Sequence, residues 1–330
     1  MVEDILSPLA APTVYIPTLI GGERLAACIE ALQSQTRNVS IVVADNGPGE
    51  GCAEMLESRF TAVTRINFQG RNLGFGSAMN RAVEFSGEGP LIFLNDDAVP
   101  GPEFVARLLE AWDGGRYEMI AGVLLNAADP ALIDSAGIIC DRTLTAWDYL
   151  TGEPVAALAS AASPLGPTGG AALFDRRAFE KVGGFDERIF LYYEDLDLAL
   201  RMRSAGMKCR LAPEAQAVHE RSATLGTWAA AKYYHTGFGR GYLLRKYGLT
   251  SHPALACKAA VSDASAVLGQ LALDRSLSGG HGRIAGWRAG RDATKRDLPL
   301  DYLTRASLFR HLKVRLARRG VSLPWGSRFS

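Results

Sequence analysis

Hydrophobic and polar positions follow a repeating order along the first 125 residues of the chain. Short runs rich in β-branched and aromatic residues predict strands at 13–17, 39–45, 62–68, 90–95 and 117–125. Between these runs, apolar residues spaced three or four apart, such as Cys28 and Leu32, predict helices, with others at 75–85 and 102–112. Alternation of strand and helix is typical of an α/β fold with a mostly parallel central sheet flanked by helices.

The pattern changes twice after this region. It loosens between about 126 and 166, and a helix with Leu196 and Leu200 toward the core follows. From about 226 onward the sequence is helical and rich in Ala, Arg and Tyr. We expect one α/β domain over 1–225, with halves at about 1–125 and 126–225, and a helical, basic C-terminal extension over 226–330.

Composition narrows the setting of the protein. Its 330 residues carry a net charge of +1, which gives no reason to expect a nucleic-acid partner. The five cysteines form no CxxC pair, so neither a disulfide framework nor a zinc site is expected. The first residues are acidic where a signal peptide is basic, and no run of about 18 apolar residues occurs. A cytoplasmic location is therefore predicted.

The end of the chain is basic. Residues 301–330 contain seven Arg or Lys and one acid. Such a segment suits peripheral contact with the anionic inner face of a membrane, and a solvated basic helix is an equal alternative.

Polar residues follow the predicted strands where each strand ends. Thr18 follows the first strand, Asp45 ends the second, and Asp96 and Asp97 follow the strand at 90–95. In α/β sheets ligands bind outside the carboxyl ends of the strands. Adjacent carboxylates suit Mg²⁺ or Mn²⁺ bound together with substrate phosphates, although an acidic cap on the next helix is an alternative. No GxGxxG follows the first strand and no GxxxxGK[ST] loop occurs, which argues against dinucleotide and P-loop sites.

Six motifs in order carry a family resemblance. They are TVYIPTL, IVVADNGPGEG, RNLGFGSAMNRAVE, LIFLNDDAVP, GGFDERIFLYYEDLDLALRMRSAG and AVHERSATLG. Over residues 13–225 the chain resembles the family 2 glycosyltransferases, which are inverting enzymes of the GT-A fold that use nucleotide sugars. Within the family it is similar to bacterial rhamnosyl- and galactofuranosyltransferases that build cell-surface polysaccharide. The resemblance implies a nucleotide-sugar half over 1–125 and an acceptor half over 126–225.

The resemblance also implies roles for residues of the nucleotide site. Asp45 corresponds to the acid that binds the base or ribose, and Thr18 would line the same pocket. Arg71 and Asn72 lie in a motif carried near the nucleotide, where an arginine can offer paired donors to phosphate. Helix capping is an equal alternative for Asn72.

The implied metal site uses the strand-end acids. Asp97 matches the second acid of the DxD-type motif and is the first choice as a ligand of Mg²⁺ or Mn²⁺. Asp96 departs from the strict motif and is predicted to contact the sugar, the ribose or the metal. His219 matches a histidine that completes the metal site in some relatives, and a structural histidine is an equal alternative.

The implied catalytic pair is Glu194 and Asp195. Asp195 corresponds to the general base that takes the proton from the acceptor hydroxyl, and Glu194 would contact the acceptor or steer Asp195. A charged helix start is the alternative reading of this pair. The predicted acceptor site consists of Thr168, Gly169 and Gly170, which lie in one loop, and Trp147, which lies in the region of irregular pattern at 126–166.

The sequence therefore predicts an inverting, metal-dependent glycosyltransferase with Asp195 as its base. It would move rhamnose or another hexose from a UDP- or dTDP-sugar to a saccharide or polyprenyl-linked acceptor hydroxyl. Processive synthases of the family carry a QxxRW motif, and none occurs here, so we expect the transfer of one sugar per event. A homodimer is left open. The alternative in another class is a non-catalytic nucleotide-sugar-binding component of a glycan assembly complex, and the presence of both Asp97 and Asp195 argues against it.

Overall fold

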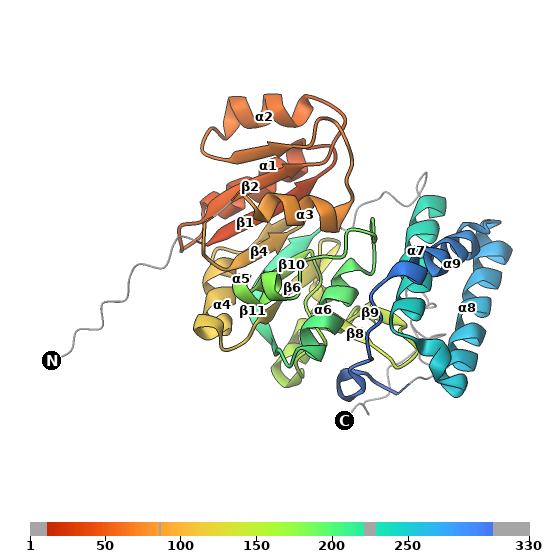
Figure 1. Cartoon of the computed structure of the whole chain (residues 1–330). Helices are drawn as coiled ribbons and strands as arrows, with labels where there is room; N and C mark the ends of the chain where they lie inside the picture. The colour runs from red at the N-terminus through yellow and green to blue at the C-terminus, as the bar shows by residue number, and fades with distance from the viewer. Residues whose placement is uncertain (1–11, 86, 221–228, 306–330) are drawn as a thin grey trace.

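An α/β body and a group of C-terminal helices make up the protein (Figure 1). The computed structural model describes residues 12–85, 87–220 and 229–305. The predicted domain boundary near 225 and most of the basic segment, beyond residue 305, lie outside these residues. All five cysteines are free thiols. Within the described residues, no helix has both the length and the apolar character needed to cross a membrane.

The first half of the sheet is parallel. Its strands are β1 (Thr13–Thr18), β2 (Ser40–Asp45), β3 (Thr64–Asn67) and β4 (Leu91–Leu94), in the order β3-β2-β1-β4. Helices α1 (Glu23–Gln33), α2 (Gly51–Arg59) and α3 (Phe75–Val83) connect them. Each strand falls within one or two residues of its predicted range. The apolar runs of β1, β2 and β4 are almost wholly buried and leave a clear signal, whereas β3 is an edge strand with exposed ends.

The second half makes the sheet mixed. It contains β5 (Ala98–Pro100), β6 (Met119–Asn126), β7 (Asp129–Ser135), β10 (Ala171–Phe174) and β11 (Cys209–His219). Strand β10 runs antiparallel between β4 and β6, and β11 runs parallel to β6 but antiparallel to β5. The sheet is thus mixed where the sequence predicts a mostly parallel one. The pairing of β11 with β6 has an irregularity between Leu211 and Gln216.

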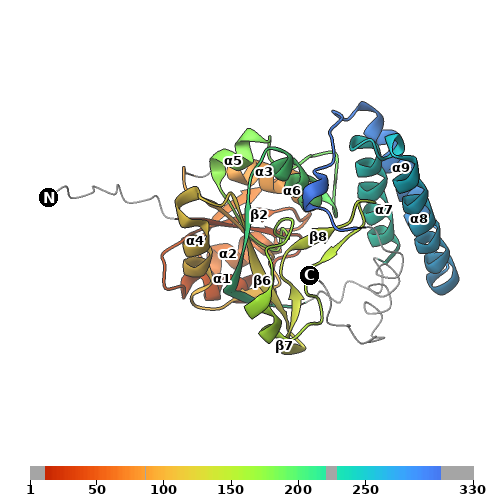
Figure 2. The ribbon, with the colours of Figure 1, turned by 90° about the horizontal axis from the view of Figure 1, so that it is seen from below.

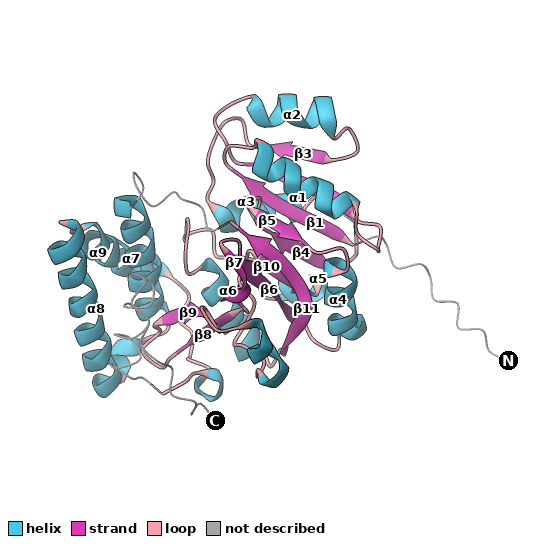
Figure 3. Cartoon of the chain, turned by 180° about the vertical axis from the view of Figure 1, so that it is seen from behind, coloured by secondary structure: helices cyan, strands magenta, loops and turns pink. Residues whose placement is uncertain are grey.

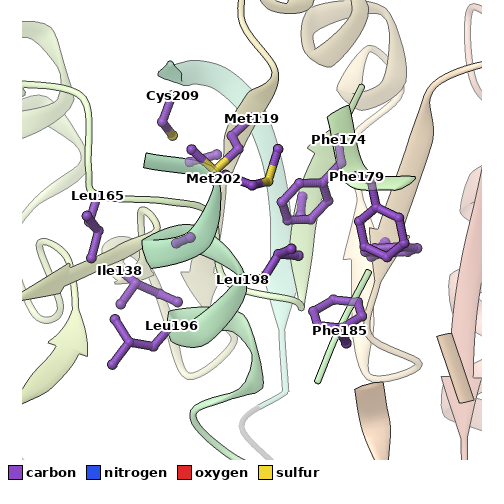
Figure 4. Close-up of a cluster of buried hydrophobic side chains, with 14 of the residues drawn as sticks. Met119, Ile138, Leu165, Phe174, Phe179, Phe185, Leu196, Leu198, Met202 and Cys209 are labelled. Carbon is purple, nitrogen blue, oxygen red and sulfur yellow. The ribbon is translucent and has the colours of Figure 1, made fainter. Parts of the chain in front are cut away.

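Helices cover both faces of the sheet. Helices α1, α2 and α4 (Phe104–Trp112) contribute to one hydrophobic cluster, and α3, α5 (Arg176–Lys181) and α6 (Glu194–Ser204) to the other. In the second cluster Phe93 of β4 lies 5.6–5.8 Å from the rings of Phe174, Phe179 and Phe185. Figure 4 shows the last three beside Leu198 of α6. Aromatic pairs at this spacing contribute about 0.5–1.5 kcal/mol each beyond their buried area.

A small hairpin and three helices complete the fold. Strands β8 (Ile138–Cys140) and β9 (Ala146–Asp148) form a separate two-stranded sheet in the region where the sequence pattern loosens. The C-terminal helices are α7 (Ala229–Lys246), α8 (Pro253–Asp274) and α9 (Ser278–Ala289). Helix α7 lies nearest the α/β body and α8 farthest from it (Figures 1 and 2). Seen from behind, the three helices stand beside the body, next to the β8–β9 hairpin (Figure 3).

Candidate active site

The ends of the central strands bring the predicted donor-site residues together. In the register of β1 and β2, Thr18 is paired with Asp45, and β1 lies between β2 and β4. The hydroxyl of Thr18 donates to Oδ2 of Asp96 at 2.6 Å, which joins the ends of β1 and β4. Burial raises the pKa of Asp96, and the hydrogen bond from Thr18 opposes this rise. One edge of the sheet therefore carries three of the predicted residues.

Asp45 is 1% exposed, and both of its carboxylate oxygens accept hydrogen bonds from neighbouring groups. Its Oδ1 accepts from the N–H of Gly47 at 3.1 Å. Its Oδ2 accepts from Nε and Nη2 of Arg65 at 2.9 and 2.7 Å and from Nδ2 of Asn67 at 3.1 Å. Sequence reasoning missed Arg65 and Asn67. The alternation of TRIN in β3 places both on one face of the strand, and the pairing of Asn67 with Asp45 brings them to the carboxylate.

A cavity of about 500 Å³ opens beside Asp45. Its lining joins apolar side chains, glycines and two of the predicted polar residues: Leu19, Ile20, Asp45, Pro48, Gly49, Gly51, Cys52, Gly70 and Asn72. The apolar side chains offer a surface on which a flat ring can lie, and Asp45 and Asn72 offer polar atoms at its edge. The cavity has the composition expected of a nucleobase pocket.

The loop before α3 is shaped by asparagines. Oδ1 of Asn72 accepts from the N–H of Gly74 at 2.9 Å, so Asn72 closes the turn and does not cap the helix, whose N-cap is Gly74. Asn46 accepts from the N–H of Leu73 at 2.7 Å and donates to the carbonyl of Gly74 at 3.1 Å. Arg71 is exposed at the start of this loop.

Asp97 and His219 meet because β5 pairs with β11. The pairing sets Ala98 opposite His219, and the N–H of Glu220 donates to the carbonyl of Asp97 at 2.9 Å. Nε2 of His219 then lies 3.1 Å from Oδ1 of Asp97. Its other ring nitrogen, Nδ1, lies 2.7 Å from Oδ2 of Asp134 on β7. The predicted pair is thus in direct contact, and Asp134 is a third member that sequence reasoning missed.

The imidazole of His219 is largely enclosed between the two carboxylates. Burial lowers its pKa, but the hydrogen bonds with Asp134 and Asp97 outweigh burial and raise the pKa to about 9. No cluster of three or more His, Cys, Asp or Glu in the described part of the chain is arranged to hold a metal. A metal here would have at most Asp97 and His219 as protein ligands, because Asp134 occupies the far side of the ring.

Glu194 and Asp195 begin helix α6. Glu194 is 6% exposed, and its Oε2 is buried without a hydrogen-bond partner among the described residues. Burial, and then the charge of Asp195, raise its pKa well above the usual range. Burial also raises the pKa of Asp195 to about 6, although hydrogen bonds from the main chain of Leu196 and Gly169 oppose the rise. The charge of Asp148 adds to it. A carboxyl poised near neutral pH is suited to accept a proton.

The loop at 168–170 lies against this acid pair, since Gly169 contacts Asp195 through its main chain. A Cβ at Gly169 would stand 2.6 Å from the ring of Phe75, and one at Gly170 would stand 2.7 Å from Nδ2 of Asn95. Close packing within the protein therefore accounts for the lack of side chains at both glycines. Thr168 precedes them and is half-buried.

Strand β9 presents its two polar-tipped residues to opposite faces. Trp147 is 7% exposed, so little of its ring is open to a sugar, and its role as an acceptor contact stays a prediction. The charge of Asp148 raises the pKa of Asp195, and sequence reasoning missed this residue. The signal that could have found Asp148 is alternation, since the residue after a buried tryptophan in a strand faces the other way.

The fold is that of the GT-A glycosyltransferases. The structure of GalNAc-T7 with UDP, GalNAc and Mn²⁺ is similar, with a TM-score of 0.57 and 14% identity over 76% of this chain. The chain spans about half of that structure, 51% of its length. The mannosyltransferase PcManGT of Pyrobaculum calidifontis, in complex with GDP-Man and Mn²⁺, has a TM-score of 0.51 and 16% identity. That match covers 84% of this chain and 86% of the other.

The chain belongs to glycosyl transferase family 2, whose family model matches residues 13–183. It is 31% identical over 247 residues to the N-acetylglucosaminyl-diphospho-decaprenol L-rhamnosyltransferase of Mycobacterium tuberculosis in two strains. These matches cover 68% of this chain and 78% of the relative. The predicted fold, family and enzyme class are thereby confirmed, and the non-catalytic binder loses its support. The protein is a family 2 glycosyltransferase.

Proposed function

We propose that this glycosyltransferase moves a hexose, with rhamnose as the first choice, from a UDP- or dTDP-sugar to an acceptor hydroxyl with inversion. The observation that carries the proposal is the convergence of the Asp45 pocket, the Asp97–His219 pair and the Asp195 carboxyl around one end of the sheet. The similarity to an enzyme that acts on N-acetylglucosaminyl-diphospho-decaprenol supports rhamnose and a polyprenyl-linked saccharide.

In the proposed donor site the base enters the cavity beside Asp45. Its ring would lie on Leu19, Ile20 and Pro48, with Asp45 as acceptor for an imide N–H or a ribose hydroxyl. Thr18 and Asp96, joined at 2.6 Å, would face the ribose or the sugar. Asn72 lines the pocket from the loop before α3, and the exposed Arg71 precedes it in that loop, where its guanidinium would reach a phosphate.

The residues at the end of β4 fit a divalent metal. Asp97 offers a carboxylate and His219 an imidazole, two ligands that Mn²⁺ accepts, and the carboxylate also suits Mg²⁺. These two side chains lie 3.1 Å apart, and His219, whose pKa is raised to about 9, would have to lose the proton on Nε2 to offer that nitrogen to the metal. With few protein ligands, the remaining positions would come from the diphosphate and water, as is usual for Mg²⁺. When bound, the metal supplies Lewis-acid stabilisation of the leaving diphosphate.

Asp195 is the proposed general base. Its carboxylate takes the proton of the acceptor hydroxyl while that oxygen attacks the anomeric carbon from the face opposite the diphosphate. A positioned base of this kind contributes roughly 10²–10⁴-fold to the rate. Glu194, buried beside it, steers Asp195 or contacts the acceptor. Thr168, Gly169, Gly170 and Trp147 would border the acceptor, together with Asp148.

Two partner proposals rest on the sequence alone. The basic residues at 301–330 suit peripheral contact with the cytoplasmic face of a membrane, where a polyprenyl-linked acceptor would lie. A homodimer is the proposed alternative to a monomer. Neither involves nucleic acid.

The decisive experiment is calorimetric titration of UDP and dTDP into the purified protein, with and without Mn²⁺. We expect one nucleotide to bind in a metal-dependent way, and Asp97→Ala to abolish that binding. Asp297→Ala, which removes the same charge from an exposed position, is the control and should bind normally. Absence of binding of both nucleotides under every metal condition would overturn the proposal.

A further inference from the structure

Two tyrosines directly before the acid pair have a backbone conformation that is rare for side-chain-bearing residues. Tyr192 has φ 66° and Tyr193 has φ 78°, both in the left-handed region. The Cβ of an L-residue crowds the backbone in this region, so bulky residues occur there only where the surroundings hold them. Because Tyr193 is the N-cap of α6, its conformation sets the direction in which Glu194 and Asp195 leave the loop.

Helix α7 packs directly on these two tyrosines. A Cβ at Gly239 would lie 2.6 Å from the carbonyl oxygen of Tyr192 and 2.6 Å from Cβ of Tyr193, so only glycine allows this approach. One and two turns earlier on α7, the ring of His235 stacks on Phe190 with centroids 4.9 Å apart, and Nζ of Lys232 lies 5.7 Å from the ring of Tyr192.

The same helix fixes the beginning of the loop at 186–193 and the catalytic helix itself. Asp186 accepts from Oη of Tyr242 and from Nζ of Lys246, both at 2.7 Å. Nζ of Lys246 also lies 2.7 Å from Oδ1 of Asp197, two residues after Asp195. Lys246 is 4% exposed and Asp197 is fully buried, so this is a buried network. Removing Lys246 would leave Asp186 without its paired cation, whereas Asp197 would keep Arg201 at 2.7 Å.

On the side away from α7, the loop at 186–193 contacts the start of α3, next to the proposed donor site. The carbonyl of Phe190 accepts from the N–H of Phe75, at the start of α3, at 3.0 Å. A Cβ at Gly74 would collide with this same carbonyl. Residues 186–193 are therefore held between α3, which follows the nucleotide loop, and α7 of the C-terminal extension.

We propose that α7 is a positioning element of the active site. Its close approach at Gly239 holds Tyr192 and Tyr193 in their left-handed conformation and thereby places the Asp195 carboxylate. The proposal rests on the proposed role of Asp195 as general base. It gives the C-terminal extension, which lies beyond the family match at 13–183, a part in the reaction.

The pKa of Asp195, measured from the kcat–pH profile, distinguishes a displaced base from a general loss of stability. Besides burial, the groups that act on the pKa of Asp195 are Asp148 on β9 and the main chain of Leu196, Gly169 and Asp195 itself. Glu194, next to it on α6, has its own pKa raised by the charge of Asp195. Burial is the largest cause of its raised pKa of about 6. A base displaced toward solvent loses this burial, so its pKa returns toward that of an ordinary aspartate.

The test compares three glycine-to-alanine variants of the full chain. Gly239→Ala should lower kcat by about 10–10²-fold, the cost of a base misplaced by about 1 Å, and move the acidic limb of the kcat–pH profile below pH 6. Affinity for UDP or dTDP with Mn²⁺ should stay within about twofold, since the nucleotide pocket is built on β1, β2 and the loop before α3. His235→Ala, which removes the ring from Phe190 without a clash, should shift the profile in the same direction by less.

Two controls separate positioning from stability. Gly241→Ala places its Cβ against the carbonyl of Arg283 on α9, so it should lower Tm while leaving the pH profile unchanged. Gly269→Ala on α8 meets nothing within 4 Å and should change neither. A folded Gly239→Ala with wild-type kcat and profile, or an equal profile shift in Gly241→Ala, would overturn the proposal. If Gly239→Ala does not fold, His235→Ala decides in the same way. Asp195→Asn tests the base separately, because an active Asp195→Asn would overturn the base assignment.

Discussion

At the scale of single residues, the orientation of His219 depends on a partner that no motif contains. Asp134, which is 4% exposed, binds Nδ1 of the ring at 2.7 Å and leaves Nε2 directed at Asp97. A carboxylate behind a ligating histidine fixes the tautomer and raises the basicity of the ligating nitrogen. If Asp97 and His219 hold a metal as proposed, Asp134 is expected to control its binding without touching it.

Replacing Asp134 by Asn should weaken Mn²⁺ binding in the presence of saturating nucleotide by about 10–100-fold, because the histidine loses its charged hydrogen-bond partner. Free Mn²⁺, counted by electron paramagnetic resonance during a titration, measures this without requiring turnover. Asp297→Asn, the same change at an exposed position, should leave the affinity unaltered. Equal affinities in the two variants would contradict the role of Asp134.

Residues at strand ends could be predicted from the sequence, but their partners could not. Asp45 and Asp97 follow apolar runs, and that position alone places them at the carboxyl edge of the sheet. Arg65 reaches Asp45, and Asp134 reaches His219, through strand register, which depends on pairings between segments far apart in the chain. Metal dependence and the role of each site residue stay predictions.

At the scale of elements, the parallel strands were predictable and the antiparallel part was not. The runs of β1, β2 and β4 are buried on both faces, so their continuous apolar character and the turn residues that follow mark them. Strand β10 has only four residues, and its place between β4 and β6 follows from tertiary pairing rather than from a local pattern. The β8–β9 hairpin has three residues in each strand, too short for an alternation signal.

The acid pair at the start of α6 predicts how kcat depends on pH. As the proposed general base, Asp195 must be ionised to accept a proton, and burial raises its pKa to about 6. A raised pKa in an acid means that the active, ionised form is lost as pH falls through that value. At saturating donor, kcat should therefore fall about tenfold per pH unit below pH 6. Initial rates between pH 4.5 and 8 measure this limb.

Glu194→Gln is the matched control for that profile. It removes the other acid of the pair and should leave an acidic limb in place, because Asp195 is the group that titrates. Loss of the limb in Glu194→Gln would reassign the base to Glu194.

At the scale of the whole molecule, the C-terminal helices share the core of the α/β body. Tyr242, Leu243 and Tyr247 of the α7 region belong to the same hydrophobic cluster as β4 and α6. Each fully buried side chain of this size contributes about 1.5–3 kcal/mol, a large part of a domain's net stability. The extension and the body are therefore expected to unfold together.

Differential scanning calorimetry of the full chain should accordingly show one cooperative transition. Lys246→Met leaves Asp186 and Asp197 without their shared cation, a loss of about 3–5 kcal/mol for a buried pair. For a chain of this length that corresponds to a lowering of Tm by roughly 5 °C, with the single transition retained. Lys208→Met, at an exposed lysine, should leave Tm within about a degree, as surface substitutions usually do. Two separate transitions in the wild type, or a shift of only one of them in Lys246→Met, would mean that the helices form an independent unit. The shared core would then not couple α7 to α6.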